Sequence, residues 1–195
     1  LVAYWNQENL SGLTVIEGDA LKFNFDEWAQ QRSQKSGLCK VVGNLPYNIS
    51  SPLLFHLVSA ASHIDEQVFM LQAEVVERMV APAGSSDFSR LSVMLQARYD
   101  MELALEVPPE AFEPAPKVNS AVVRMIPRRD FNLNEAQWGA LEQVVAAAFS
   151  QRRKMLRTNL QAFAGKLELS EEELKARAQD ISVNRYIEWA KVLAA

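Results

Sequence analysis

The spacing of apolar residues changes once along this chain, and the change separates an alternating region from a helical one. Short apolar runs predict strands at residues 13–17, 40–43, 67–71, 99–107 and 120–127. Helices are predicted at residues 73–81 and 91–98, a helix or loop at 21–37, and a helix that Ser51 caps and Pro52 begins. After residue 133 the composition is helical throughout. This order indicates an α/β domain followed by a small helical domain.

Several elements carry more specific expectations. The run at 67–71 fits a central strand that is buried on both faces. In the strand at 99–107, the residues expected to share one side are Met101, Leu103, Leu105 and Val107. Four prolines between residues 108 and 116 exclude regular structure there, and the strand at 120–127 then closes the sheet.

The helical region has a capping box at residues 170–173. One face of its first helix is expected to carry Val144, Val145, Ala148 and Phe149. The last helix is expected to be lined by Trp189, Val192 and Leu193.

The most informative residues follow the strand at 40–43, because open α/β sheets bind ligands where their strands end. An amine on an aromatic base is a poor nucleophile until hydrogen-bond acceptors hold it. The Asn44 side chain offers one acceptor, and Pro46, which has no N–H and a rigid φ, fixes the Leu45 carbonyl as a second. Tyr47 can stack on the base. A plain turn is the alternative interpretation.

The segments at residues 43–50, 112–124 and 149–157 are similar to the small-subunit ribosomal RNA adenine N6,N6-dimethyltransferase family, in order and in approximate spacing. The resemblance implies a Rossmann-like methyltransferase sheet at residues 1–130 and a helical RNA-binding domain at 131–195. It further implies methyl transfer from S-adenosylmethionine, without a metal, to adenosine N6 in small-subunit rRNA or an assembly intermediate of that subunit. The catalytic residues would be Asn44, Leu45, Pro46 and Tyr47.

The same resemblance implies that Asp19, Ala20 and Asn44 bind the cofactor, with Asp19 accepting a hydrogen bond from its adenine amine. A helix cap is the alternative role for Asp19. Rossmann-like sheets open with a strand and a Gly-rich turn, but no G-x-G occurs here and the chain starts at Leu1. We therefore expect an N-terminal portion of the methyltransferase sheet to be missing, and the first residues to be the tail of a helix.

Charge distribution favours an RNA partner. The chain carries a net charge of −4, yet its segment from Lys117 to Arg157 carries eight basic and three acidic residues. A local basic face suits a structured RNA better than indiscriminate polyanion binding. The candidate RNA contacts are Phe112, Lys117, Arg124, Arg152, Arg153, Lys154 and Arg157. The last four are expected on one helix, with a merely solvated face as the alternative.

Composition limits the remaining possibilities. No apolar run is long enough for a membrane span, and the single Cys39 excludes an internal disulfide, so we expect a cytoplasmic protein. We also expect a monomer. His56 and His63 have no third ligand and indicate no metal site. Two alternatives stay open: the large-subunit rRNA adenine methyltransferase of the macrolide-resistance type, and a non-catalytic RNA-binding ribosome assembly factor. The segment at 151–154 favours the small-subunit family over the first.

Overall fold

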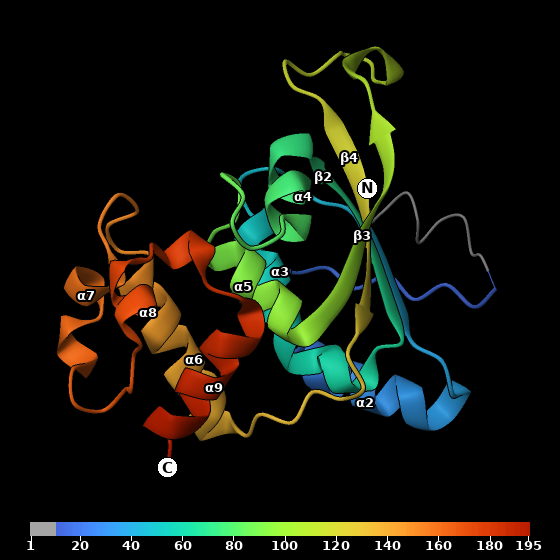
Figure 1. Ribbon diagram of the computed structural model, residues 1–195. Coiled ribbons are helices and arrows are strands. Elements are labelled where there is room, and N and C mark those ends of the chain that lie inside the picture. Colours follow the sequence, from blue (N-terminus) through green and yellow to red (C-terminus); the bar gives the residue numbers. More distant parts are fainter. Residues whose placement is uncertain (1–10) are drawn as a thin grey trace.

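Four strands form one mixed sheet, with helices packed against it and a cluster of helices beyond (Figure 1). The computed structural model describes residues 11–195. The strands are β1 (Lys40–Asn44), β2 (Glu66–Gln72), β3 (Tyr99–Val107) and β4 (Ser120–Pro127), in the order β1-β2-β4-β3. β1 and β2 are parallel, whereas β4 is antiparallel to both β2 and β3. The predicted α/β class and the closing antiparallel hairpin are confirmed.

Helices connect the strands and make up the C-terminal part. The α-helices are α2 (Phe25–Ser36), α3 (Ser50–Val58), α4 (Ala73–Val80), α5 (Arg90–Arg98), α6 (Glu135–Ala148), α7 (Leu156–Asn159), α8 (Glu171–Lys175) and α9 (Val183–Leu193). Short 3-10 helices are η1 (Ser59–His63), η2 (Pro109–Ala111), η3 (Gln161–Phe163) and η4 (Ala178–Asp180). The predicted capping box is present, because the Ser170 hydroxyl accepts from the Glu173 N–H at 3.1 Å. Of the helices at residues 11–195, none is long and apolar enough to cross a membrane.

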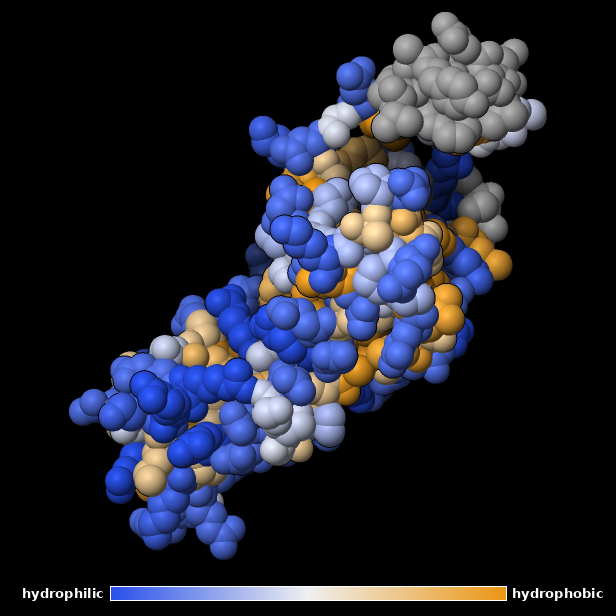
Figure 2. Space-filling view, turned by 90° about the horizontal axis from the view of Figure 1, so that it is seen from above, coloured by the Kyte–Doolittle hydropathy of each residue, from blue (hydrophilic) through white to orange (hydrophobic). Residues whose placement is uncertain are grey.

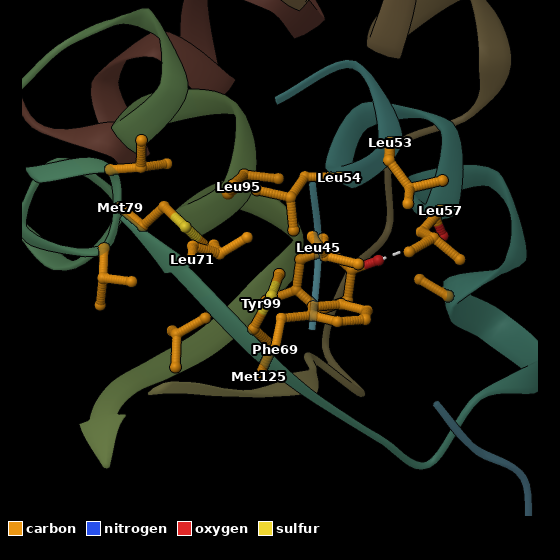
Figure 3. Packing of buried hydrophobic residues seen from close by; sticks show 14 of the residues in the cluster. Leu45, Leu53, Leu54, Leu57, Phe69, Leu71, Met79, Leu95, Tyr99 and Met125 are labelled. Carbon is orange, nitrogen blue, oxygen red and sulfur yellow. Dashed lines mark hydrogen bonds between the residues drawn. The ribbon is translucent and has the colours of Figure 1, made fainter. Parts of the chain in front are cut away.

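One face of the sheet packs against α3, α4 and α5 to form the first hydrophobic core (Figure 3). The buried side chains from the strands include Phe69, Leu71, Val123 and Met125. The helices contribute Leu53, Leu54, Leu57, Val76, Met79 and Leu95. Tyr99 lies within this core, where its hydroxyl donates to the Leu57 carbonyl at 3.2 Å.

A second core joins α5 to the C-terminal helices. The other side of α5 buries Val93, Met94 and Ala97. These residues share a cluster with Leu141, Val144, Val145, Tyr186 and Trp189 from α6 and α9. Since α5 contributes to both cores, it links the sheet to the helical part.

The predicted strand at 13–17 is wrong, since these residues have no regular structure. Leu13 and Ile16 are 47% and 57% exposed. A strand needs a neighbour to pair its backbone N–H and C=O groups, and β1 pairs only with β2 among the described residues. The expected helix tail at the start of the chain lies outside the described residues.

Tertiary packing also changes the faces of two strands. A register shift in β3 pairs Leu103 with Val123 but Leu105 with Val122, so the four apolar residues of β3 do not share one side. β2 is central, as predicted, but it is fully buried on one face and only half-buried on the other. The expectation of burial on both faces is therefore wrong.

Three helix details differ from the sequence pattern. α3 begins at Ser50 with Ile49 as its N-cap, so Ser51 is already inside the helix. Val192 is 57% exposed and does not line the core side of α9. The 3-10 turn η2 lies within the proline-rich connection, where no regular structure was expected.

Candidate active site

The loop after β1 is anchored on both sides before it enters α3. The Leu45 N–H donates to the Met70 carbonyl at 3.1 Å, which continues the pairing of β1 with β2. The Leu45 side chain is 7% exposed and belongs to the first core. The Ile49 N–H donates to the Pro46 carbonyl at 3.1 Å and closes the turn. The loop therefore holds one fixed conformation at the carboxyl end of two parallel strands, which is the edge where such sheets bind ligands.

Gly43 allows this arrangement. A Cβ atom on Gly43 would lie 3.0 Å from Leu45 Cδ2 and 3.4 Å from Phe69 Cδ1. A side chain at residue 43 would therefore press on Leu45 and Phe69 in the core. The position of the loop depends on this close contact.

Two acceptors of this loop are available for a ligand. Asn44 is exposed, and its side-chain amide makes no hydrogen bond among the described residues. The Leu45 carbonyl likewise receives no hydrogen bond within the described part of the chain. Asn44 is the last residue of β1 and Leu45 follows it, so both acceptors lie at the same end of the strand.

Tyr47 is held by β4. Its hydroxyl lies 2.9 Å from Ser120 Oγ, and Ser120 is buried at 1% exposure. The Tyr47 ring is 38% exposed, and its carbonyl accepts from the Ser50 hydroxyl at 3.1 Å. The ring is thus fixed at its far end while part of its surface stays open, as a stacking platform requires. The sequence does not point to Ser120, because no local pattern reveals a contact between residues 73 positions apart.

The connection between β3 and β4 lies at the same edge. In Figure 1 it projects beyond the end of the sheet where β2 runs into α4. The Asn119 carbonyl accepts from the Ala73 N–H at 2.9 Å, which fixes the end of this connection beside α4. Within it, Phe112 is half-buried and Lys117 is exposed. Their predicted roles in RNA binding stay predictions.

Asp19 and Ala20 lie beside β1, the strand that ends at Asn44. They line a cavity of about 540 Å³ that is bordered by Val41 and Val42 of β1, but Asn44 is not among its lining residues. Asp19 Oδ1 accepts from the Leu21 N–H at 3.0 Å, so its carboxylate caps a turn. The predicted role of Asp19, Ala20 and Asn44 in cofactor binding stays a prediction.

The candidate basic helix is mostly a turn. Arg152, Arg153 and Lys154 lie between α6 and α7, and only Arg157 is helical, so the predicted helical spacing is wrong. The Asn159 side chain donates to the Gln151 carbonyl at 3.1 Å and holds this turn against α7. All four basic side chains are exposed, and none has a carboxylate partner among the described residues. We call these four residues the basic turn. The surface of the helical part of the molecule is strongly hydrophilic (Figure 2).

The positive charge of Arg124 is already paired with two carboxylates of the protein. Its guanidinium pairs with Glu66 and, at 3.0 Å, with Glu102, while Lys40 pairs with Glu66 at 2.6 Å. Hydrogen bonds from Lys40 and Arg124 lower the pKa of the Glu66 carboxyl to about 2. Because two carboxylates occupy Arg124, we do not include it in the proposed RNA surface.

The histidines and the cysteine make local contacts. His56 Nε2 lies 2.7 Å from the Phe23 carbonyl, and His63 Nε2 lies 3.9 Å from Asp26. In residues 11–195 no group of three or more His, Cys, Asp or Glu side chains is placed to hold a metal ion. Cys39 is buried, and burial raises the pKa of its thiol.

Comparisons with known proteins found a matching family model and several similar relatives. A sequence model described as "Ribosomal RNA adenine dimethylase" matches residues 3–195. Two similar relatives are described as "Ribosomal RNA small subunit methyltransferase A": that of Burkholderia lata is 53% identical and that of Bordetella pertussis 54% identical, each over 185 residues. Each match covers 94% of this chain, but the chain spans only 66% and 67% of the length of these two relatives.

Solved structures show the same fold. A dimethyladenosine transferase from Plasmodium falciparum matches with a TM-score of 0.75 and 24% identity, over 96% of this chain and 74% of that chain. The 23S rRNA methyltransferase ErmE matches with a TM-score of 0.63 and 21% identity, over 99% of this chain and 78% of that chain. At these identities the likeness concerns the fold alone. The family model covers nearly the whole chain and includes the anchored loop after β1, so this chain belongs to the ribosomal RNA adenine dimethylase family.

Proposed function

We propose that this chain is part of an S-adenosylmethionine-dependent enzyme that dimethylates adenosine N6 in small-subunit rRNA during ribosome assembly. The observation that carries the proposal is the anchored loop after β1, where the Asn44 amide oxygen and the Leu45 carbonyl have no hydrogen-bond partner in residues 11–195. Relatives at 53% and 54% identity carry the matching description.

The chemistry of these two acceptors follows from the nucleophile. The lone pair of an adenine amine is delocalised into the ring, and two acceptors that hold its N–H groups favour a more tetrahedral, more nucleophilic nitrogen. The target base, turned out of its RNA context, would stack on Tyr47, whose hydroxyl Ser120 restrains. Pro46 contributes by stiffening the loop and, with no N–H, by leaving no competing donor. Positioning and electrostatics then account for most of the rate.

The cofactor would lie against the outer side of β1. When bound, S-adenosylmethionine supplies an electrophilic methyl group on its sulfonium. Asp19 and Ala20 border a cavity of about 540 Å³, within the usual size range of small-molecule sites. Among the described residues, the second Asp19 oxygen, Oδ2, has only the Lys22 ammonium as a partner, at 3.9 Å, and so is available for an adenine amine. Asn44, at the end of the same strand, would then lie between cofactor and base.

RNA would contact both ends of the molecule. Phe112 and Lys117 lie on the β3–β4 connection at the sheet edge, and the basic turn extends the contact onto the helical part. We assign residues 1–130 to the methyltransferase domain and 131–195 to an RNA-binding domain, in a cytoplasmic monomer. A folded substrate, such as a partly assembled small subunit, would engage both regions, whereas a short oligonucleotide would engage only the loop.

Two other functions are compatible with parts of this geometry. The fold is similar to that of a 23S rRNA methyltransferase, but the relatives above 50% identity are described as small-subunit enzymes. Methylation of isolated small-subunit and large-subunit rRNA distinguishes these two. A non-catalytic assembly factor would bind RNA without transferring a methyl group from labelled S-adenosylmethionine.

Replacement of Asn44 tests the proposed site. Asn44→Ala in the complete protein should lower methyl transfer roughly a hundredfold, or about 3 kcal/mol, because it removes one preorganised acceptor. RNA affinity should change little, since no phosphate contact is lost. Asn132→Ala is the matched control, because Asn132 is an exposed asparagine outside the loop. Wild-type turnover by Asn44→Ala at saturating substrate would disprove the assignment.

A further inference from the structure

A groove of about 950 Å³ lies between the sheet and the helical part. Its walls come from the end of α3 and the turn η1 that follows it, the end of α5, the segment that joins β4 to α6, and the start of α6. They include Arg98, Arg128, Phe131 and Trp138, together with the carboxylates Asp26 and Glu135. β4 is antiparallel to β2, so Pro127 and this groove lie at the opposite end of the sheet from the Asn44 loop. At roughly 3.3 Å per residue, the strands separate the two regions by about 20 Å.

Arg98 is the unusual residue of this groove. It is only 7% exposed, yet it makes no ion pair among the described residues. One of its nitrogens donates to the Arg128 carbonyl at 3.3 Å, and its guanidinium lies 4.4 Å from the centre of the Phe131 ring. These contacts use one of five N–H donors. A buried cation normally has an anionic partner, because burial removes its hydration.

The neighbouring arginines are different, because each has its own carboxylate. Arg128 pairs with Asp130 at 2.9 Å, and Arg129 pairs with Asp65 at 3.1 Å. Their charges are balanced by these carboxylates, whereas no carboxylate of residues 11–195 pairs with Arg98. An anion that enters the groove would therefore gain most from Arg98.

Aromatic side chains stand next to this cation. Phe131 and Trp138 make an edge-to-face pair with ring centroids 5.7 Å apart, and both line the groove. Trp138 is half-buried, so part of its indole faces the open space. A cation beside an accessible aromatic surface matches a phosphate followed by a base or ribose.

We propose that this groove is a second RNA-binding site, in which Arg98 binds a phosphate of the substrate strand and Trp138 contacts the adjoining nucleoside. The identity of the ligand as RNA rests on the proposed function. The distance from the Asn44 loop means that one RNA molecule reaches both sites only if it is extended or folded around the sheet. The groove thus adds to the preference for a large, structured substrate.

NMR of the tryptophan indole N–H groups tests the proposal in the full chain. The Trp138 indole donates to Glu142 at 3.2 Å, and Trp138→Phe identifies its signal. We expect titration with a single-stranded ribo-oligonucleotide to shift this signal saturably, while Trp189, buried in the second core, stays unchanged. Inorganic phosphate and adenosine monophosphate should shift it only at much higher concentrations, since they lack the neighbouring phosphates.

Arginine variants then assign the contact. Arg98→Met should weaken oligonucleotide binding at least about tenfold, because a charge-assisted contact is lost, and lower the log–log salt slope by about 0.7. Arg124→Met is the matched control, because two carboxylates already occupy Arg124. Its RNA affinity should equal that of the wild type. Arg98→Lys, which keeps the charge, should retain more affinity than Arg98→Met.

Several results would overturn the proposal. These are an unmoved Trp138 signal in the wild-type titration, a shift by mononucleotide but not by oligonucleotide, and equal binding by folded Arg98→Met. The wild-type titration decides the matter even if Arg98→Met does not fold. Failure of the catalytic proposal is distinguishable, because Asn44→Ala should lower methylation roughly a hundredfold and leave the Trp138 shift intact.

Discussion

Gly43→Ala tests whether close packing positions the candidate active site. The added Cβ would lie 3.0 Å from Leu45 Cδ2 and 3.4 Å from a Phe69 ring carbon. Carbon atoms prefer separations of about 3.5–4.0 Å, so Leu45 or its surroundings must shift by a few tenths of an ångström. Leu45 and Phe69 are 7% and 1% exposed, which leaves little room for that movement. Overpacking of this kind typically costs about 1–3 kcal/mol.

The functional effect should exceed the effect on stability. The close contact spans Asn44, so a backbone adjustment that relieves it would shift the Asn44 and Leu45 acceptors. Misplacement by roughly 1 Å near a reacting group can lower a rate about a hundredfold. We therefore expect Gly43→Ala to fold, with a lower urea midpoint, and to lose between about tenfold and a hundredfold in methyl transfer.

Two further variants complete the assay. Gly139→Ala is the matched control, since it adds the same methyl group inside α6 with nothing within 4 Å, and should raise stability by up to about 1 kcal/mol. Leu45→Val shortens the side chain that clashes, so its destabilisation and that of Gly43→Ala should be less than additive. A wild-type urea midpoint for Gly43→Ala, or full additivity in the double variant, would refute the reasoning.

Three other expectations follow from the contacts. Tyr99→Phe should lower the free energy of unfolding by about 1–3 kcal/mol in urea titration, because the buried Leu57 carbonyl loses its donor; a change below roughly 0.5 kcal/mol contradicts this. Hydrogen bonds from Lys40 and Arg124 depress the Glu66 pKa to about 2, so the stability that this carboxylate adds is present above its unfolded pKa of about 4.3 and is lost as pH falls toward 2. Between these pH values, acid should lower the thermal unfolding temperature of Glu66→Gln less than that of the wild type. Parallel plots of unfolding temperature against pH for the two proteins would argue against the ion pairs. Paired replacement of Arg152 and Arg153 by Gln should lower the log–log salt slope of RNA affinity by about 1.4, whereas paired replacement of Lys22 and Arg90 should leave it unchanged.

Local sequence determined the elements and the position of the loop. Alternating and continuous apolar runs are sufficient to identify β1, β2, β3 and β4, because a strand between a buried and an open surface needs that spacing. The capping box at Ser170 depends on residues three apart, so it is visible without any tertiary information. The motif of Asn44 to Tyr47 follows directly after a strand, and its place at the sheet edge follows from that order alone.

Contacts between distant segments decided the rest. Residues 13–17 have the spacing of a strand, but pairing requires a neighbour, which no local pattern supplies. The bulge in β3 depends on its register with β4. Arg124 resembles a free cation in the sequence, and only the alignment of β2, β3 and β4 places Glu66 and Glu102 beside it. Likewise, the hydrogen bond from Tyr47 to Ser120 joins two segments that meet only when the sheet has formed. Sequence thus specified which groups this protein carries, whereas tertiary structure determined which of them are already paired and which remain available to a ligand, because pairing depends on distances between segments that are far apart in the chain.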